Sequence, residues 1–414
     1  MLNAQKEREL AYLVKVDAVT PIAGYDRVEL AHVGGWTIVV GKGEFKAGDP
    51  AIYFEIDSKL PEVEPFINME FLAKKKYKIK TQKMCKSISQ GLLMSAANFG
   101  WTIKEDNNNA PVIEAYIPGQ DYSLHRLDDE SRFLTKKLGV TYAVPEDNTR
   151  KANSVDKYKK MAQRHPKLFR NKVIKWLMNR GWGRTLLFFF FGKKKDTKSG
   201  WPAWVTKTDE ERIENLPYLF NEKGTWIATE KIDGTSTTFT LKRGKGLFKK
   251  NEFFVCSRNV VFDKPDKKCF YENNVYTEMA EKYDIENKLT ALLVEHPEWD
   301  WVTIQGETYG QSIQKRDYHM NTHDFAAFNF VTSTEGRWDS VKMNELLSQI
   351  GVPCVPILNE AYILPDNLDK LRAYVDSEKS KIDHDMREGI VFREPGGRRS
   401  FKCVSPTFLL RFHS

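Results

Sequence analysis

Short runs of apolar and β-branched residues, separated by turn residues, occur on both sides of a segment rich in lysine and arginine. Such runs are typical of strands. A basic segment between two such regions predicts two β-rich bodies joined by a connector. The chain has 414 residues, enough for two or three domains that each bury a core. We expect domains at 1–146 and 201–414, with residues 147–200 as the connector.

The composition excludes several classes of protein. Hydrophobic residues make up 41% and aromatic residues 12% of the chain, which excludes a disordered chain. The five cysteines are scattered without a CxxC pair, so a disulfide framework or a zinc ribbon is not expected. The longest apolar run, Leu186–Phe191, is far shorter than the roughly 20 residues of a membrane span. With no secretory signal in MLNAQKEREL, we expect an intracellular protein that is not secreted, has no membrane association and needs no obligate protein partner.

Positive charge is concentrated in the connector. Between Arg150 and Lys198 there are 16 Lys and Arg residues and only two acidic residues, so this segment carries +14. Because the whole chain carries +8, the remainder is net acidic. Such a segment is either a solvated linker or a surface for a polyanion. Its content of Trp176, Trp182 and Leu186–Phe191 favours a partly helical segment that packs on a neighbour.

The N-terminal region predicts a small barrel or sandwich of short strands. The segments LAYLVKVDAVTPI, VELAHVGGWTIVVG and AIYFEID are strand-like and are separated by turn signals that contain glycine and proline. Further on, Lys76, Lys78 and Lys80 alternate with Tyr77 and Ile79, which on a strand would place the lysines on one face. That face is either an ordinary solvated surface or one that binds nucleic acid.

The C-terminal region predicts strands with a few helices. A short helix is expected in DEERIENL with Thr208 as its N-cap, and helical patterns also occur at Val275–Val294 and Ser340–Ile350. The strand-like segments are TWIATEKI, STTFTLK, EFFVCSRNVVF, DWVTIQGE, FAAFNFV, GIVFRE and RRSFKCVS.

The segment TEKIDGTS contains the most informative residues. Lys231–Gly234 form a KxDG sequence, which alone is a weak signal because a strand that ends in an Asp-Gly turn gives the same pattern. Its significance rises with the ordered segments that follow: SRN at Ser257–Asn259, QGETYG at Gln305–Gly310, FAAFNF at Phe325–Phe330, EGIVFR at Glu388–Arg393 and SFKCVS at Ser400–Ser405. Lysine attacks a nucleotide α-phosphate only as a free amine, and only where cations neutralise the phosphate charge.

With these motifs in this order, the C-terminal region resembles the covalent nucleotidyltransferase superfamily of polynucleotide ligases and capping enzymes. The resemblance implies that Lys231 is the nucleophile and forms a lysyl–AMP phosphoramidate. Asp233 and Glu388 would position hydrated Mg²⁺ or Mn²⁺, because hard cations prefer oxygen ligands and often retain water. Glu307 would contact the ribose or support the metal shell. Lys402 would bind the α-phosphate and stabilise the pyrophosphate that leaves.

The same resemblance assigns further contacts with ATP. Arg258 matches the element that touches the nucleotide sugar or the incoming phosphate, Gly234 belongs to the KxDG turn, and Glu230 matches the position that recognises adenine in RNA ligases. Phe328 is the best candidate to stack on the base. A place in the core is the alternative for Phe328, because three phenylalanines of FAAFNF lie close together and cannot all be ligands.

One position departs from the superfamily pattern. The lysine strand usually reads KxK, but Ser400 stands two residues before Lys402. Either Arg398 or Arg399 supplies the missing charge, or the site works without it.

The order of the domains narrows the resemblance to ATP-dependent RNA ligases with an N-terminal OB domain. The chain ends 12 residues after Lys402, which leaves no room for an OB domain there. The segment GGWTIVVGKGEFKAGDPAIYFEIDSKLP is similar to the N-terminal OB domain of these RNA ligases. We expect an α+β chain: an N-terminal OB-fold β-barrel, then a ligase-type nucleotidyltransferase domain built on antiparallel sheets with flanking helices.

The implied reaction seals RNA ends that carry a 3′-OH and a 5′-phosphate. Lys231 takes AMP from ATP, AMP passes to the RNA 5′-phosphate, and the 3′-OH displaces AMP to form the phosphodiester. The alternatives are a DNA ligase, a GTP-dependent capping nucleotidyltransferase, or a catalytically inactive RNA-binding relic. We expect the OB domain and Arg150–Lys198 to hold the RNA, with binding that weakens steeply as salt rises.

Overall fold

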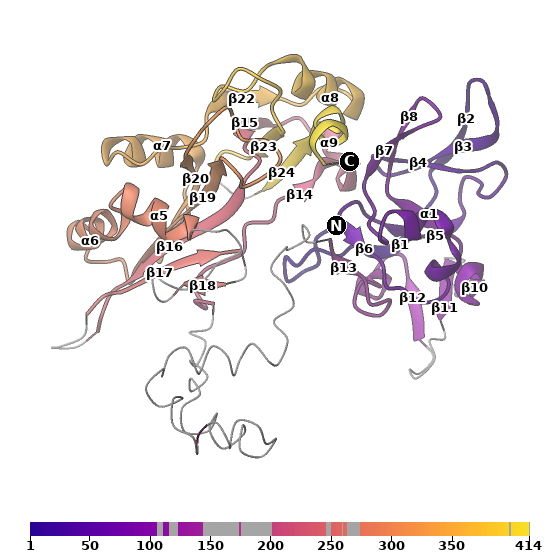
Figure 1. The fold of residues 1–414 in the computed structure, drawn as a ribbon, viewed down its shortest axis with the longest axis horizontal. Coiled ribbons are helices and arrows are strands. Elements are labelled where there is room, and N and C mark those ends of the chain that lie inside the picture. The colour runs from indigo at the N-terminus through magenta and orange to yellow at the C-terminus, as the bar shows by residue number, and fades with distance from the viewer. Residues whose placement is uncertain are drawn as a thin grey trace.

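The protein is described by a computed structural model. It covers residues 1–105, 111–115, 123–143, 174, 201–245, 250–258, 260–262, 274–396 and 399–413. These residues form two bodies that lie side by side, an N-terminal one up to residue 143 and a C-terminal one from residue 201 (Figure 1). The predicted connector 147–200, and with it the basic segment Arg150–Lys198, lies almost entirely outside the described residues.

Short antiparallel strands build the N-terminal body, as predicted. One three-stranded sheet contains β1 (Ala11–Lys15), β5 (Pro50–Phe54) and β9 (Leu92–Met94), and a second contains β2 (Ala18–Ile22), β3 (Tyr25–Val33) and β4 (Trp36–Gly41). The smaller pairings are β6 (Ser58–Lys59) with β13 (Thr141–Tyr142), β7 (Thr81–Met84) with β8 (Ser87–Gln90), and the sheet β10 (Thr102–Glu105), β11 (Pro111–Ala115), β12 (Ser123–Arg126). A short helix, α1 (Glu70–Lys74), precedes β7.

The alternation of side chains along these strands explains their packing. In β4, Trp36, Ile38 and Val40 are buried and the residues between them are partly exposed, which is the pattern of a sheet with one face on a core. Each such side chain contributes about 1.5–3 kcal/mol when it is fully buried. The ring of Trp36 packs on Tyr53 of β5 with centroids 5.7 Å apart, so the two sheets share one core.

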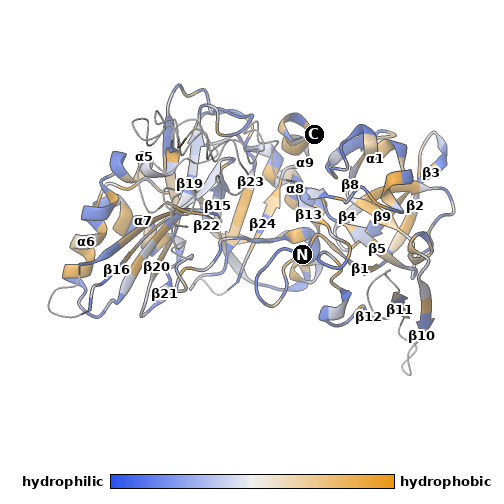
Figure 2. Ribbon diagram, turned by 60° about the horizontal axis from the view of Figure 1, so that its bottom comes forward, coloured by the Kyte–Doolittle hydropathy of each residue, from blue (hydrophilic) through white to orange (hydrophobic). Residues whose placement is uncertain are grey.

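Two sheets build the C-terminal body. The five-stranded sheet has the order β14 (Glu211–Arg212), β24 (Ser400–Val404), β23 (Gly389–Arg393), β15 (Thr225–Lys231) and β22 (Ile357–Ile363). The six-stranded sheet has the order β18 (Val261–Phe262), β17 (Glu252–Ser257), β16 (Thr235–Lys242), β19 (Trp301–Gly310), β20 (His323–Thr332) and β21 (Gly336–Arg337). All neighbours are antiparallel except β14 and β24. Figure 2 shows β23 and β24 as largely hydrophobic strands, as expected of the middle of a covered sheet.

Helices cover these sheets. The six-stranded sheet shares a core with α5 (Val275–Lys282), α6 (Ile285–Glu295) and α7 (Ser340–Gln349), which confirms the predicted helical segments. The five-stranded sheet is covered by α8 (Leu368–Ser377) through Leu371 and Val375. The last helix, α9 (Pro406–Phe412), lies between the bodies and packs against β7 (Figure 1). Within the described ranges, none of the helices has the length and apolar character needed to cross a membrane.

Two local predictions were wrong. The segment DEERIENL is not a helix but the short strand β14 followed by a 3₁₀ turn at Ile213–Asn215, because β14 pairs in parallel with β24. The lysine segment is not a strand at Lys76 and Tyr77, which have positive φ angles of 52° and 58° and end helix α1. Burial of Tyr77 and Ile79 and partial exposure of Lys78 and Lys80 nevertheless follow the predicted alternation.

The glycine turn of the β3–β4 hairpin contacts the C-terminal body. The tip of the β3–β4 hairpin donates the Gly35 N–H to the carbonyl oxygen of Glu214 at 2.7 Å. A Cβ at Gly35 would lie 2.7 Å from Cα of Glu214, so the two backbones could not approach this closely with any other residue. Glu214 also accepts a hydrogen bond from Arg372 of α8 at 2.9 Å, which fixes the contact from the other side.

A buried ion cluster forms a second contact between the bodies. The carboxylate of Glu55, just after β5, is fully buried and pairs with Arg8 at 2.6 Å. Arg212 of β14 lies 3.6 Å from the same carboxylate and donates to Asp57 at 3.3 Å. The Met1 ammonium also pairs with Glu55. Because Arg8 and Arg212 come from different bodies, the cluster couples the position of one to that of the other.

Candidate active site

The predicted nucleophile lies at the end of β15 beside a carboxylate. Pairing of β15 with β23 sets Lys231 opposite Gly389, the residue that follows Glu388. The Lys231 ammonium donates a hydrogen bond to Glu388 Oε2 at 2.8 Å. Both side chains are largely enclosed, with 23% and 10% of their surfaces exposed. The sheet therefore brings together two predicted site residues from distant parts of the sequence.

The Asp-Gly turn after Lys231 lies directly against β19. A Cβ at Gly234 would lie 2.3 Å from the carbonyl oxygen of Thr308 and 2.9 Å from Cγ of Glu307, so only glycine permits this approach. The close approach explains why glycine occupies the last position of the KxDG sequence. It also sets Glu307 beside the turn, on the same side as Lys231.

Three side chains that the sequence did not single out hold this turn. The backbone N–H of Asp233 donates to the Tyr318 hydroxyl at 2.6 Å. Gln314 Nε2 donates to the carbonyl oxygen of Gly234 at 2.9 Å. The Asp233 carboxylate lies 3.1 Å from Nε2 of His413, just after α9. Burial opposes protonation of His413, but the hydrogen bond and the charge of Asp233 raise its pKa above the ordinary value.

Negative charge dominates the surroundings of Lys231. Burial lowers the pKa of this lysine, but Glu388, Glu307 and Asp233 outweigh it and leave the pKa above its ordinary value. Burial, with the nearby carboxylates, raises the pKa of Glu307 to about 8. Burial likewise raises the pKa of Glu388. Lys231 is thus held as an ammonium ion, and one of the carboxyl groups stays protonated near pH 7.

This donor set fits a divalent cation held through water. Glu388 pairs with Lys231 and Asp233 with His413, whereas among the described residues Glu307 forms no ion pair, and burial above all raises the pKa values of Glu307 and Glu388. In the part of the chain that the structure describes, no group of three His, Cys, Asp or Glu side chains is arranged to hold a metal ion directly. Oxygen ligands with few direct protein contacts are the arrangement that Mg²⁺ accepts.

Positive charge dominates around the second predicted lysine. Lys402 lies on β24, opposite Val391 of β23 and beside Arg212 of β14. Burial, together with the charges of Arg8 and Arg212, lowers the pKa of Lys402 to about 7. Val391 pairs with Lys402 on one side and with Thr229 on the other, and Lys231 lies two residues beyond Thr229, so the two lysines lie on the same face of the sheet. A bound phosphate would relieve the repulsion between these cations.

Arg258 lies at the edge of this cationic side. It follows β17 and forms an ion pair with Asp209. Its guanidinium lies 5.2 Å from the centre of the Tyr142 ring of the N-terminal body, within the range of a cation–π contact. Asp209, from the segment wrongly predicted as a helix, therefore orients a predicted ligand of the nucleotide.

The structure separates Phe328 from its two neighbours. Phe325 and Phe330 are fully buried in the core under α5–α7. Phe328 is the extra residue of a β-bulge between β20 and β19, so it faces the other side of the sheet and stays partly exposed. Arg393 of β23 donates a hydrogen bond to the carbonyl oxygen of Phe328 and pairs with Glu210 at 3.2 Å. Phe328 is thus the one phenylalanine of the three that is available to stack on a base.

Glu230 is buried and already has hydrogen-bond donors. Its carboxylate accepts from the Ser380 hydroxyl at 2.5 Å and from the Lys381 N–H at 2.8 Å. Burial raises the pKa of Glu230 despite these bonds. Each oxygen of the Glu230 carboxylate therefore already accepts one hydrogen bond. The role of Glu230 in recognising adenine stays a prediction.

Ser400 lies among ionic groups rather than beside a replacement lysine. Its hydroxyl donates to Glu210 and accepts from Arg337 at 3.4 Å. Arg399 does not supply the missing charge, because its guanidinium pairs at the surface with Glu222 at 2.7 Å and Glu394 at 2.9 Å. Arg398 lies outside the described residues.

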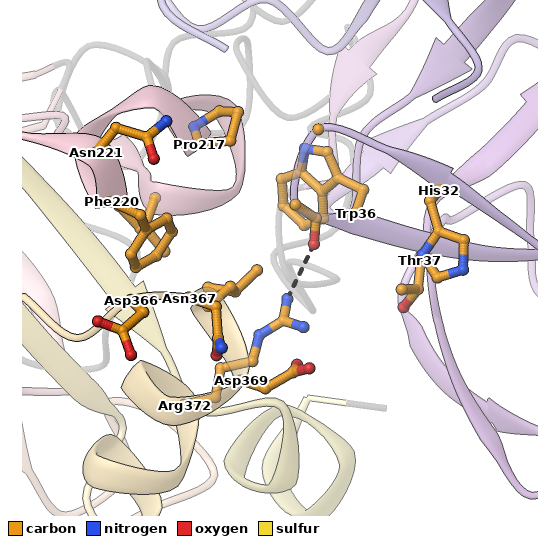
Figure 3. Close-up of a pocket in the computed structure, with 14 residues that line it drawn as sticks. His32, Trp36, Thr37, Pro217, Phe220, Asn221, Asp366, Asn367, Asp369 and Arg372 are labelled. Carbon is orange, nitrogen blue, oxygen red and sulfur yellow. Dashed lines mark hydrogen bonds between the residues drawn. The ribbon is translucent and has the colours of Figure 1, made fainter. Parts of the chain in front are cut away.

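A cavity of about 370 Å³ lies between the bodies, away from these residues. It is lined by the β3–β4 turn and by segments of the C-terminal body, and it contains none of the predicted site residues. Figure 3 shows Arg372 pointing from α8 toward the N-terminal body. Its Nη2 donates to the carbonyl oxygen of Gly35 at 3.4 Å and to Gln90 at 3.0 Å. These contacts are structural, since they tie α8 to the turn.

The arrangement of sheets, with a lysine at the end of a strand and acidic residues on the neighbouring strands, is the one expected of a ligase-type nucleotidyltransferase domain. Residues 224–404 match the family model described as RNA ligase, and residues 10–96 match a model of an OB-fold domain. The chain therefore carries an RNA ligase domain preceded by an OB-fold domain. The predicted family, fold class and enzyme class are confirmed.

Solved structures of one enzyme have this fold over nearly the whole chain. A Naegleria gruberi RNA ligase with PPi has 24% identity and a TM-score of 0.67, and the match covers 97% of this chain and 98% of that chain. Two variants of that ligase, one with ATP and Mn and one with AMP and Mn, have 23% and 24% identity, each with a TM-score of 0.66 and the same coverage. None of the curated proteins compared matches the sequence.

Proposed function

We propose that this RNA ligase is ATP-dependent and that it seals 3′-OH and 5′-phosphate ends through a lysyl–AMP intermediate on Lys231. The observation that carries the proposal is the hydrogen bond from the Lys231 ammonium to Glu388, inside a cluster that also contains Glu307 and Asp233. A simple structural ion pair poorly explains this cluster, because Glu307 adds a buried carboxyl group beside the Lys231–Glu388 and His413–Asp233 pairs. The ATP and AMP complexes of the Naegleria gruberi enzyme support ATP as the nucleotide.

The charges suggest how the first step is controlled. The neighbouring carboxylates hold Lys231 protonated, and a protonated amine cannot attack phosphorus. Mg²⁺ or Mn²⁺ positioned by Asp233 and Glu388 would neutralise the carboxylates and the phosphate charge. The proton of Lys231 would pass to its hydrogen-bond acceptor Glu388, Nζ would form the bond to the α-phosphorus, and the bond from the α-phosphorus to the bridging oxygen of pyrophosphate would break. Lys402 lies on the same face of the sheet and would stabilise the α-phosphate and the expelled pyrophosphate.

The remaining residues orient the nucleotide. Phe328 would stack on the base from the open face of β20, and Glu230 would recognise adenine from the end of β15. Arg258 would contact the ribose or the incoming 5′-phosphate, and Glu307 the ribose or the metal shell. In the next two steps, AMP passes from Lys231 to the RNA 5′-phosphate and is then displaced by the 3′-OH.

The finer points of organisation are part of the same proposal. The domains would be 1–146, 147–200 and 201–414, with the connector adding to the RNA surface. The four described cysteines, Cys85, Cys256, Cys354 and Cys403, are all free thiols, which supports an intracellular site of action. The protein would act on RNA ends without an obligate protein partner.

The test is covalent labelling. The protein is incubated with α-labelled ATP or GTP and Mg²⁺ or Mn²⁺, after treatment with pyrophosphate to remove any AMP already bound, and is then separated under denaturing conditions. We expect label from ATP in the wild type and in Lys223→Ala, which changes an exposed lysine just before β15. We expect none in Lys231→Ala.

Other outcomes would redirect the proposal. Label from GTP alone would favour a capping nucleotidyltransferase, and sealing of DNA but not RNA would favour a DNA ligase. No label from either nucleotide after pyrophosphate treatment would leave an RNA-binding relic. Persistent label in Lys231→Ala would show that another residue is the nucleophile.

A further inference from the structure

Lysines of the N-terminal body lie on the rim of the active site. The segment after α1 runs beside β6: the Asp57 N–H donates to the carbonyl oxygen of Ile79 at 2.8 Å, and the Ile79 N–H donates to that of Ser58 at 2.8 Å. Tyr77 and Ile79 are buried, so the lysines that alternate with them lie on the outer side. Asp57 is bonded to Arg212 of the ligase domain, which ties this segment to the site.

A lysine of the ligase domain lies on the same rim. Lys315 is exposed on the loop between β19 and β20. The residues on either side of it are fixed: Gln314 donates to the carbonyl oxygen of Gly234 at 2.9 Å, and Arg316 pairs with Asp383 at 2.5 Å. Lys315 is therefore held beside the turn that follows Lys231, although its own side chain is free to reach outward.

These lysines form one electrostatic group across the domain boundary. The pKa of Lys80 is lowered by burial and then by the charges of Lys315 and Lys78, with a smaller effect of Lys75, while Asp57 opposes the shift. Packing of α9 against β7 holds the two domains together at this point. A polyanion that lies along this rim would meet lysines of both domains at once.

We propose that this junction lysine group, Lys75, Lys78, Lys80 and Lys315, binds the backbone phosphates of the RNA next to the break. The proposal rests on the ligase function proposed above. A polymer fits better than a nucleotide, because the group spans two domains and lies at the exposed rim. The phosphate of a nucleotide would instead meet the buried cations around Lys402. The group would therefore serve the two steps that use RNA, and not the adenylylation of Lys231.

The test separates these steps. In the double variant Lys80→Ala/Lys315→Ala we expect the rate of lysine adenylylation from ATP to stay within about twofold of wild type. AMP transfer to an RNA 5′-phosphate and sealing should fall at least about tenfold near physiological salt. Two lost phosphate contacts should also reduce the slope of log K against log salt for single-stranded RNA by about 1.4.

Matched variants provide the controls. Lys104→Ala removes a lysine from β10, at the far end of the N-terminal body in Figure 1, where it pairs with Glu114, and should leave every step unchanged. Lys80→Arg/Lys315→Arg retains the charge and should restore RNA binding. Melting temperatures close to wild type would show that the variants are folded.

Three outcomes would overturn the inference. An equal loss of adenylylation and sealing would mean that the lysines serve ATP. Unchanged RNA affinity and salt slope in the double variant would mean that no RNA phosphate lies there. A loss of RNA binding in Lys80→Arg/Lys315→Arg as large as that in the alanine double variant would exclude a role for charge. Because RNA affinity is measured directly by filter binding, these results remain decisive even if the wild type fails to form lysyl–AMP, a failure that would instead refute the proposed function.

Discussion

The two sides of the candidate active site have opposite charge and different origins. Around Lys231 the neighbours are carboxyl groups, all from the ligase domain, and they raise the pKa of the lysine. Around Lys402 the neighbours are Arg8 and Arg212, of which Arg8 belongs to the OB domain, and with burial they lower its pKa to about 7. One side is suited to a cation and the other to an anion. The comparison indicates that the OB domain helps to complete the anion side.

The largest effect on stability is expected from removing the negative charge of Glu55, which pairs with the Met1 ammonium and lies beside Arg8 and Arg212. Burial alone would raise the pKa of Glu55, but the Met1 ammonium, Arg8 and Arg212 depress it far below the ordinary value. Glu55→Gln would leave those buried cations unpaired and should cost about 3–5 kcal/mol of unfolding free energy near pH 7. Denaturant unfolding measures this, with the exposed Glu62→Gln as the control.

The same residue gives a dependence on pH. A depressed carboxyl pKa contributes stability above its unfolded value near 4.5, and this stability is lost as the pH falls through the folded value. The wild type should therefore lose more stability than Glu55→Gln between pH 5 and about 3. An equal loss of unfolding free energy in both proteins would mean that Glu55 does not stabilise Arg8 and Arg212 by its charge.

On the acidic side, Glu388→Gln should reduce the rate of lysine adenylylation about 10²–10³-fold, since it removes a charge beside the reacting centre. The pKa of Lys231 should fall at the same time, because Glu388 is the largest of the charges that raise it. The pH profile of the residual activity would then shift to lower pH. Glu360→Gln changes an exposed residue on β22 of the same sheet and should leave the rate unchanged.

A smaller effect is expected from titrating Lys402. With a pKa of about 7, this lysine loses its proton as the pH rises from 6 to 8, and its attraction for phosphate falls. Pyrophosphate should bind the AMP-free protein up to about tenfold more weakly at pH 8 than at pH 6. Lys402→Arg should flatten that dependence, because guanidinium stays charged. An identical profile in the variant would assign the titration to another group.

The smallest effect is expected on the binding of the adenine base of ATP. Arg393 holds the carbonyl oxygen of the bulged Phe328 and pairs with Glu210. Arg393→Lys cannot make both contacts with the same geometry, so KM for ATP in adenylylation should rise several-fold. Sealing of RNA that is already adenylylated should keep its rate. The control is Arg399→Lys, which changes a surface arginine directly before β24. Equal KM values for ATP in the two variants would mean that Arg393 does not act on the binding of the base.

The sequence predicted the strands, and it pointed to candidate site residues, because both are signalled by local patterns. Short runs of apolar and β-branched residues marked β15 and β16, and the KxDG turn lies between the two strands. The wrong helix at DEERIENL shows the limit of such patterns. Asp209 and Glu210 form ion pairs with Arg258 and Arg393, and β14 pairs with β24, all of which are contacts between distant parts of the chain.

The rest of the site could not be predicted for the same physical reason. Phe328 faces the opposite side of the sheet from Phe325 and Phe330 because a bulge shifts the register of β20. The sequence contains no single residue that predicts a bulge. Arg8 and His413 come from opposite ends of the described chain. Arg8 acts on Lys402 across the domain boundary, and His413 lies beside Asp233 within the ligase domain. Ion pairs of this kind depend on the whole fold.

The glycine turn at the tip of the β3–β4 hairpin limits how the OB domain can change its length. Hairpin tips usually tolerate insertions because they lie in solvent. Here the tip lies against the backbone of Glu214, with no space for even a single Cβ at Gly35. An inserted residue would have to move the OB domain away from the ligase domain, and Arg8 would move with it. The spacing of this hairpin therefore fixes the position of the OB domain, and with it the charge of Arg8 near Lys402.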